Sequence, residues 1–230
     1  MDPSYRPSPL AVAVLSMLVP GPLHPYGIQR LIKHWGKDQV VNVGQRANLY
    51  KTIKRLHAAG LIAVRQTERD QQYPERTVYE LTEDGRRQAP EWLASMLVTV
   101  RNEFPQFPAA LSFAMLLAPG QLQAGLEQRA AVLREDLARI ERDLENLSAS
   151  LPRVTLLDDE YRRAVTAAEL AWIDGVLADL RTGVLTWSRE QLASVAMEDL
   201  GLLATDLPPE YTLDAEPARP ARPDARRRPG

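Results

Sequence analysis

Apolar residues recur at helical spacing three times near the start of the chain. The first run, residues 9–19, ends at a Pro-Gly-Pro turn and has the apolar content of a buried helix. The second run, residues 26–35, is closed by Gly36, and the third, about residues 46–59, is closed by Gly60. The pattern therefore predicts three short helices in succession.

A β-hairpin is predicted after the third helix. Two β-prone runs, residues 61–67 and 77–81, flank a polar segment with Pro74, and proline cannot sit in a central ladder. We therefore expect a long tip over residues 68–76. Thr82 then caps a further helix, whose first turn contains two acidic residues that complement the helix dipole.

Two long helices dominate the second half of the chain, at about residues 119–150 and 158–197, after a short apolar helix at residues 109–117. Apolar residues recur in both long helices at steps of three and four, which is typical of a coiled-coil seam. The candidate dimerisation residues on these seams are Leu126, Leu133, Leu137, Ile140, Leu144, Leu170, Ile173, Leu177 and Leu180.

The second long helix has a further apolar stripe, formed by Val165, Ala168, Trp172 and Val176. A helix with two apolar stripes can contact two neighbours, one in its own chain and one in another subunit. The alternative is a monomeric antiparallel helix hairpin that packs on its own domain.

The order of these elements is that of a mostly α protein, with an N-terminal winged helix-turn-helix and a β-hairpin wing, followed by a C-terminal helical, coiled-coil-like dimerisation region. We expect the winged helix-turn-helix DNA-binding domain at residues 8–100 and the helical dimerisation domain at residues 106–200. Residues 208–230 are rich in proline and arginine and are expected to be a disordered tail.

The composition is that of an ordinary folded protein. Of the 230 residues, 45% are hydrophobic and 25% are charged. Cysteine is absent, which excludes disulfides, thiolate metal sites and a cysteine nucleophile, and which fits a reducing cytoplasm. The longest apolar stretch, residues 10–22, is shorter than the roughly 20 residues that a membrane helix needs. We therefore expect a cytoplasmic protein that makes no membrane contact.

Charge is distributed unevenly, although the formal net charge is only −2. Residues 1–90 contain 13 Lys and Arg against 8 Asp and Glu, whereas residues 91–214 contain 10 against 20. The last segment, residues 215–230, contains 5 against 2. This asymmetry indicates a basic module that faces an anion, joined to an acidic module with another task. Chance and hydrated charged surfaces are the alternative explanation.

The third helix has a basic face. With Leu49, Ile53 and Leu56 buried, lysines dominate the opposite side, and no acidic residue lies between Gln39 and Thr67. Lysines can neutralise phosphates, and the small alanines on this face permit close approach to the wall of a DNA groove. The candidate DNA-binding residues of this helix are Asn48, Tyr50, Lys51, Lys54 and Arg55.

Three of the candidates have two interpretations each. Asn48 either addresses an adenine edge or helps to cap its helix. In the hairpin, Arg69 and Arg76 either contact backbone phosphates of DNA or pair with the neighbouring acidic residues of an exposed loop.

Other candidate chemistry is sparse. The three histidines form no metal-ligand spacing, and His34 and His57 are expected on solvated helix faces. The sequence has no phosphate-cradling glycine loop, dinucleotide fingerprint or nucleophile elbow, so we expect no enzyme, no metal and no cofactor. Trp92 and Trp172 are candidates for binding a small hydrophobic or aromatic effector, with core packing as the alternative.

Three motifs suggest a family. They are Leu-His-Pro-Tyr-Gly-Ile at residues 23–28, Asn-Leu-Tyr at 48–50 with Ala-Gly-Leu-Ile at 59–62, and Tyr-Glu-Leu-Thr-Glu-Asp-Gly at 79–85. With them, residues 10–92 resemble the PadR family of transcriptional regulators. The resemblance implies a cytoplasmic homodimer that usually represses transcription and releases DNA when a small, often aromatic, effector binds. Residues 107–198 are similar in length and heptad pattern to the dimerising region of the larger members.

We therefore predict a sequence-specific DNA-binding transcriptional regulator, a homodimer that binds a palindromic operator in double-stranded DNA. Repression, and release by a small hydrophobic or aromatic effector, follow from the resemblance alone. The main alternative is a winged-helix module that binds other proteins and never DNA. A ligand-binding helical bundle with an enzymatic role is a third hypothesis.

Overall fold

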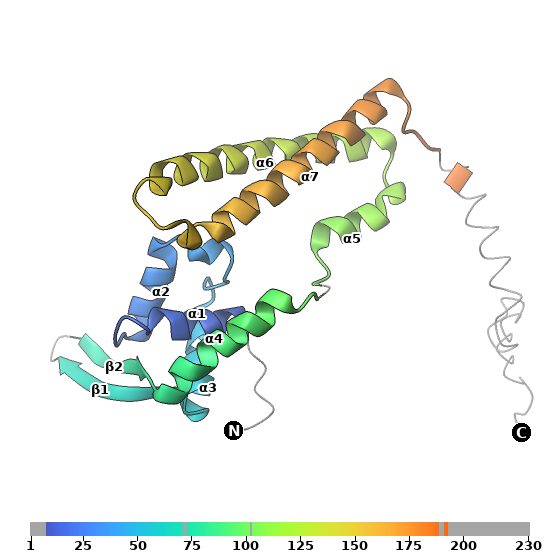
Figure 1. Ribbon diagram of the computed structural model, residues 1–230. Coiled ribbons are helices and arrows are strands. Elements are labelled where there is room, and N and C mark those ends of the chain that lie inside the picture. Colours follow the sequence, from blue (N-terminus) through green and yellow to red (C-terminus); the bar gives the residue numbers. More distant parts are fainter. Residues whose placement is uncertain (1–7, 71–72, 102, 189–190, 193–230) are drawn as a thin grey trace, which may run out of the picture. The chain divides into compact units, whose positions relative to one another are not determined.

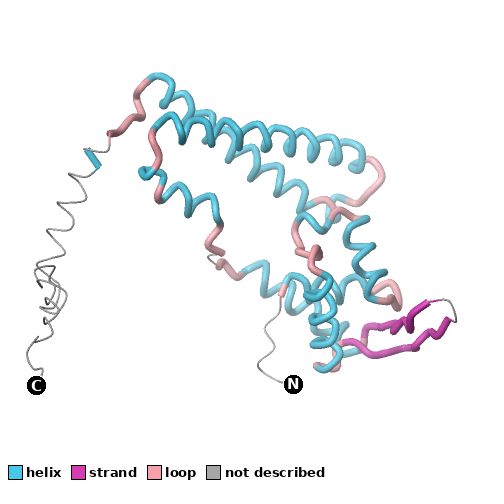
Figure 2. The backbone as a smooth tube through the Cα atoms, turned by 180° about the vertical axis from the view of Figure 1, so that it is seen from behind, coloured by secondary structure: helices cyan, strands magenta, loops and turns pink. Residues whose placement is uncertain are grey.

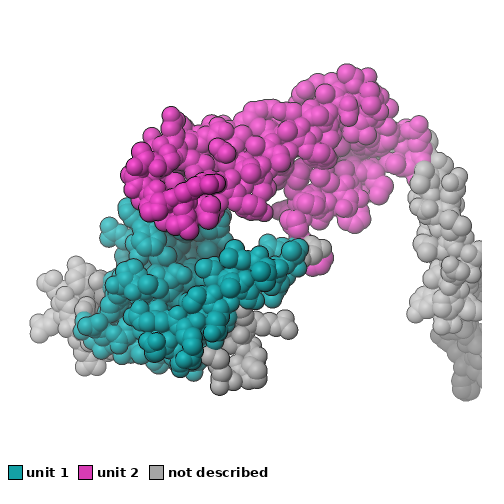
Figure 3. Space-filling model, in the orientation of Figure 1, with its two compact units in different colours: residues 1–103 teal, residues 104–230 magenta. Residues whose placement is uncertain are grey.

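The computed structural model describes residues 8–70, 73–101, 103–188 and 191–192. Contacts along the chain divide it into two compact units, residues 1–103 and 104–230, which Figure 3 colours separately. The first has the element order of a winged helix-turn-helix, and the second is built around two long helices (Figure 1). The predicted fold class is confirmed: the described chain is mostly helical with one antiparallel hairpin.

The N-terminal unit consists of α1 Pro9–Met17, α2 Pro25–His34, the 3-10 turn η1 Lys37–Gln39, α3 Arg46–Ala58, β1 Ile62–Asp70, β2 Tyr73–Leu81 and α4 Glu83–Val98. The central helix is α1, which packs against α2, α3 and α4. Ala11, Val14 and Leu15 of α1 are completely buried, as expected for a helix that is apolar on most sides. The Ser8 hydroxyl accepts a hydrogen bond of 3.2 Å from the Ala11 N–H and caps the first turn.

Glycines end α2 and α3, as the sequence predicts. Gly36 and Gly60 have φ angles of 68° and 72°, a region that favours glycine. After α3, the Gly60 N–H donates to the His57 carbonyl and the Leu61 N–H donates to the Leu56 carbonyl, both at 3.0 Å. This pair of hydrogen bonds is a Schellman motif, which satisfies carbonyls at the end of the helix.

The hairpin has longer strands and a shorter tip than the sequence predicts. β1 and β2 pair antiparallel from Ile62 opposite Leu81 to Asp70 opposite Tyr73. The expected tip over residues 68–76 is therefore wrong, since most of it belongs to the ladder. Pro74 is compatible with this arrangement because each strand of a two-stranded sheet has an edge that needs no hydrogen-bond donor.

The base of the hairpin is fastened to the helices at two places. Leu23 and Tyr79 exchange two backbone hydrogen bonds of 2.9 Å, so the segment before α2 forms a short bridge with β2. Thr82 caps α4, as predicted, by accepting a hydrogen bond of 3.1 Å from the Gly85 N–H. Its hydroxyl also donates to the Gly60 carbonyl at 2.7 Å, which ties the end of α3 to the start of α4.

The C-terminal unit consists of α5 Gln106–Ser112, the 3-10 turns η2 Ala114–Leu116 and η3 Arg153–Thr155, and the helices α6 Pro119–Ser148 and α7 Leu157–Thr182. The two long helices lie side by side and antiparallel (Figures 1 and 2). Four ion pairs cross between them, with N–O distances of 2.5, 2.6, 2.8 and 3.6 Å: Arg129 with Glu169, Arg134 with Asp174, Arg181 with Glu127, and Arg162 with Asp136.

The last predicted helix is shorter than expected. It ends at Thr182 and is followed by Gly183 with a φ of 76°, whereas the heptad pattern predicted an end near residue 197. The apolar pattern continues through Trp187, but its indole N–H donates to the Leu117 carbonyl at 3.0 Å instead of extending the helix. Residues 193–197 of the predicted helix and the predicted tail at residues 208–230 lie outside the described residues.

The predicted seam is formed inside one chain. Leu126, Ile173 and Leu177 are buried together with Ala130, and Leu133, Leu170 and Leu180 pack against that cluster. Ile140 is also buried, and Leu137 and Leu144 are partly buried. The structure thus assigns the clustered residues to packing of α6 on α7, as in the antiparallel alternative, and their place in a subunit interface stays a prediction.

Candidate nucleic-acid interface

α3 has a buried face and an outward face. Leu49, Ile53 and Leu56 are at most 1% exposed and belong to the core of the N-terminal unit. The outward face forms a shallow hollow lined by Ala47, Tyr50, Lys51, Lys54, Arg55 and Ala58. These residues recur every three or four positions, so their side chains form a single stripe along the helix. This is the orientation predicted from the sequence.

The stripe is basic and open to solvent. Lys51 and Lys54 are exposed, and neither forms an ion pair with another described residue. Tyr50 is 47% exposed beside them, so its hydroxyl can donate to a phosphate oxygen. Because Ala47 and Ala58 are small, a bulky partner can approach the backbone of the helix closely. The stripe thus combines exposed positive charge with small side chains.

Asn48 lies in the first turn of α3 and is exposed. Its Nδ2 donates to the Oε1 of Gln45 at 3.0 Å, and Gln45 is the residue that precedes the helix. The side chain therefore contacts another amide side chain and caps no backbone N–H group. Its role in reading a base stays a prediction.

Two polar side chains that position these helices were missed by the sequence analysis. The Gly27 N–H donates to Nδ1 of His24 at 2.6 Å, which caps α2. Nε2 of Gln29 donates to the Val43 carbonyl at 2.8 Å, in the segment that leads into α3. The His24 cap could have been found, because it directly precedes a proline in the first turn. No local pattern could reveal a partner 14 residues away from Gln29.

In the wing, Arg69 and Arg76 lie within β1 and β2, not in an open loop. Arg76 is paired with Glu68 in the register of the ladder. The side chains of both arginines lie outside the part of the structure that is described. Nearer the base of the hairpin, Arg65 forms an exposed ion pair of 3.5 Å with Glu80 on the opposite strand.

Comparison with known families decides the class of the N-terminal unit. Residues 14–91 match the family model described as the transcriptional regulator PadR-like family. The chain contains a PadR-like domain. Because that family consists of transcriptional regulators, the expectation that the chain is not an enzyme agrees with the match. A search of curated proteins found no match to the chain.

Solved structures agree with the fold of the PadR-like domain and extend the likeness beyond it. Bacillus subtilis PadR in complex with operator DNA is 20% identical with a TM-score of 0.63, and the match covers 74% of this chain and 98% of that one. The same Bacillus protein in complex with p-coumaric acid is 18% identical with a TM-score of 0.58, covering 76% and 99%. The Vibrio cholerae virulence activator AphA is 18% identical with a TM-score of 0.56, covering 75% and 98%.

The two candidate effector-binding tryptophans lie in different units. Trp92, in α4, is partly buried against the core of the PadR-like domain, which is the core-packing alternative. Trp172, in α7, is 47% exposed and meets Phe107 edge-on, with ring centroids 6.2 Å apart. The Arg129 guanidinium lies over the Phe107 ring, 3.8 Å from its centroid. Effector binding by either tryptophan stays a prediction.

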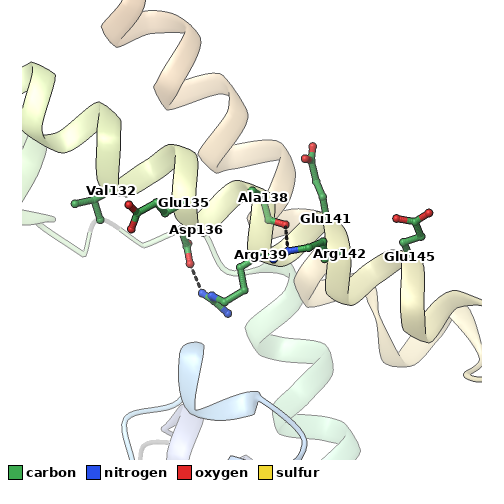
Figure 4. Close-up of a pocket in the computed structure, with 8 residues that line it drawn as sticks. All are labelled: Val132, Glu135, Asp136, Ala138, Arg139, Glu141, Arg142 and Glu145. Carbon is green, nitrogen blue, oxygen red and sulfur yellow. Dashed lines mark hydrogen bonds and ion pairs between the residues drawn. The ribbon is translucent and has the colours of Figure 1, made fainter.

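A second surface hollow lies on α6, outside the PadR-like domain (Figure 4). Its lining is mostly charged and of both signs: Val132, Glu135, Asp136, Ala138, Arg139, Glu141, Arg142 and Glu145. Arg139 pairs with Asp136, and Nε of Arg142 donates to the Ala138 carbonyl. None of the four acidic and two basic side chains of this lining is buried, so the hollow holds no buried polar group that would select a ligand.

The described residues hold no group of three or more histidine, aspartate or glutamate side chains that could bind a metal ion. No helix in the described part of the chain is long and apolar enough to cross a membrane.

Two carboxyl groups of the C-terminal unit have lowered pKa values because each belongs to an exposed ion pair. The hydrogen bond from Arg181 lowers the pKa of Glu127, and the hydrogen bond from Arg153 lowers the pKa of Glu160.

Proposed function

We propose that the chain is a cytoplasmic, sequence-specific DNA-binding transcriptional regulator in which α3 enters the major groove. The single observation that supports this most strongly is the outward stripe of α3, on which Lys51 and Lys54 have no ion-pair partner among the described residues. In helix-turn-helix proteins the second helix of the motif lies in the groove while the first crosses the backbone. The PadR-like domain supplies that pair as α2 and α3, and the likeness to a PadR crystallised with operator DNA points to the same partner.

The experiment is a titration of duplex DNA against the full chain at several salt concentrations. Each lysine that neutralises a phosphate releases counterions, so the logarithm of the binding constant should fall linearly with the logarithm of salt. The double variant Lys51→Ala and Lys54→Ala should lose affinity and reduce that slope by about 2 for each subunit bound. An unchanged circular dichroism spectrum would show that the double variant keeps the helix content of the wild type.

A matched control keeps the charge count equal. Arg142 and Arg163 are exposed cations of the C-terminal unit, so replacing both by alanine removes two charges without touching α2 or α3. This control should reduce affinity much less than the double variant in α3. Equal losses would mean that only the total charge matters, and an unchanged affinity of the α3 variant would contradict the proposed interface.

We also propose that the chain acts as a homodimer. α7 leaves a row of large apolar side chains exposed: Leu157, Tyr161, Val165 and Trp172 are 49%, 71%, 46% and 47% exposed. Their spacing places them on one face of the helix, away from the seam with α6. A second copy of the same face would cover them. Two α3 helices would then meet half-sites about 34 to 36 Å apart, or a multiple of that distance.

The sign of regulation follows from the family resemblance. We propose repression that a small aromatic or hydrophobic effector relieves, supported by the PadR neighbour crystallised with p-coumaric acid. A reporter gene behind the selected operator tests this, because deletion of the regulator should raise expression. The Vibrio neighbour is called an activator, so a fall in expression would instead assign that role. A chain that binds proteins but no duplex DNA would favour the winged-helix interaction module.

A further inference from the structure

The segment between the two helices of the DNA-binding motif is unusually long. α2 ends at His34 and α3 begins at Arg46, so residues 35–45 connect them. A helix-turn-helix turn typically has about 3 to 4 residues, which fix the angle between the helices by themselves. The longer connection needs another device to hold α3 in place.

Gln29 of α2 forms a hydrogen bond with the segment that leads into α3. Its Nε2 donates to the Val43 carbonyl at 2.8 Å, and the Val43 side chain is 1% exposed in the core. Gln29 itself is 8% exposed, and no other polar or charged side chain is buried among the described residues. A buried amide is tolerated in an apolar core only when its hydrogen bonds are satisfied, so this residue has a specific task.

The bond acts on one end of α3. Val43 lies two residues before Gln45, the residue that precedes the helix, so the Gln29 contact sets where the first turn begins. The far end is held separately, because the Leu61 N–H bonds to the Leu56 carbonyl and Thr82 bonds to the Gly60 carbonyl. Loss of the Gln29 hydrogen bond would therefore loosen the backbone before the first turn of α3, with the Val43 side chain still in the core, and would leave the far end in place.

We propose that Gln29 is a positioning residue that fixes the first turn of α3 and thereby sets the discrimination between specific and nonspecific DNA. This inference rests on the proposed function. Residues at the start of a recognition helix contact base edges, whereas phosphate contacts supply the affinity that does not depend on sequence. Lys51 and Lys54 lie further along α3, so they keep their phosphate contacts when the first turn shifts.

The test compares wild type with Gln29→Met, which keeps the side-chain length and removes the hydrogen-bond donor. The specific probe is a duplex that the wild-type full chain selects from a random pool, and the nonspecific probe is a scrambled duplex of equal length. We expect the ratio of the two affinities to fall about tenfold, with nonspecific affinity within about twofold of wild type and an unchanged salt slope. Gln39→Met, at an exposed position of the same connection, should change neither affinity.

A second measurement separates positioning from stability. Amide hydrogen exchange without DNA should accelerate at residues 45–49 in the variant, while residues 53–58 retain wild-type protection. Gln29→Leu, which also has no hydrogen-bond donor, should behave like Gln29→Met. Equal acceleration across all of α3, or specific and nonspecific affinities that fall together, would show a merely structural role and overturn the proposal.

The outcomes also distinguish this inference from the proposed function. A wild-type chain that enriches no sequence contradicts sequence-specific binding, and the discrimination assigned to Gln29 fails with it. A wild-type chain that enriches a sequence, combined with a Gln29→Met variant that retains the full affinity ratio, leaves the proposed function intact and overturns only the role of Gln29.

Discussion

In the N-terminal unit, fifteen buried residues from α1 to α4 and the hairpin form one core, whereas in the C-terminal unit four buried residues form a seam between α6 and α7. The first unit exposes charge on α3, and it exposes the large apolar side chains of Leu93, Leu97 and Val98 on the second half of α4. The second exposes apolar side chains such as Val165 and Trp172 on α7. The contrast teaches that the N-terminal unit has the larger core within one chain, while the helical unit has a small core and an apolar face on α7, which we propose that a second copy covers.

The largest effect on stability should come from adding a side chain at Gly85, where the N-terminal unit is most tightly packed. A Cβ on Gly85 would lie 2.1 Å from the Leu61 carbonyl oxygen, a backbone atom that cannot move aside easily. Gly85→Ala should therefore destabilise this unit by about 3 kcal/mol, measured by thermal or urea unfolding.

The matched change in the C-terminal unit should have the opposite sign. Gly125, within α6, has no heavy atom within 4 Å of an added Cβ. Gly125→Ala should raise the stability of the helical unit by up to about 1 kcal/mol, because alanine favours the helix. Similar losses for both glycines would contradict the view that only the N-terminal unit is tightly packed here.

A charge on the exposed face of α7 should act on assembly and not on the fold. Val165→Arg should weaken self-association by about 30-fold, or about 2 kcal/mol, because the new guanidinium would be buried in the proposed dimer. Light scattering across a concentration series measures the change. Ala167→Arg is the control, since position 167 is exposed on another side of the same helix. If wild type has the mass of one chain at micromolar concentration, the proposed dimer is wrong.

The loss of a helix cap in the N-terminal unit should also have a small effect. His24→Ala removes the acceptor for the Gly27 N–H and should cost about 1 kcal/mol of unfolding free energy. His24→Asn should restore most of it, because asparagine is a strong N-cap residue. His34→Ala, at the exposed last position of α2, is the control and should change stability by less than about 0.5 kcal/mol. Equal losses at both histidines would argue against a cap.

Much of the fold could be predicted from the sequence because its signals are local. Helical spacing placed Leu49, Ile53 and Leu56 inward, and the glycine stops at residues 36 and 60 set the ends of α2 and α3. These features depend on residues within one or two turns of each other, so a pattern along the chain is enough to find them.

Two predictions from the sequence were wrong: the length of the hairpin tip and the end of the last helix. The polar residues 68–76 suggest a loop, yet cross-strand pairing carries the ladder through them. In α7 the heptad pattern runs past Gly183, but the positive φ of that glycine ends the helix. For the candidate site, the basic stripe of α3 was predictable, whereas the bond from Gln29 to Val43 depends on how α2 packs on the segment before α3.

The most direct test of the account is to let the full chain select duplexes from a random pool and to sequence those that stay bound. The account predicts one enriched motif with two inverted half-sites, spaced about one helical turn or a multiple apart. It also predicts that the Lys51→Ala and Lys54→Ala double variant enriches far less of that motif. Recovery of random sequence only, with equal amounts bound by wild type and the double variant, would contradict the proposal that α3 reads DNA.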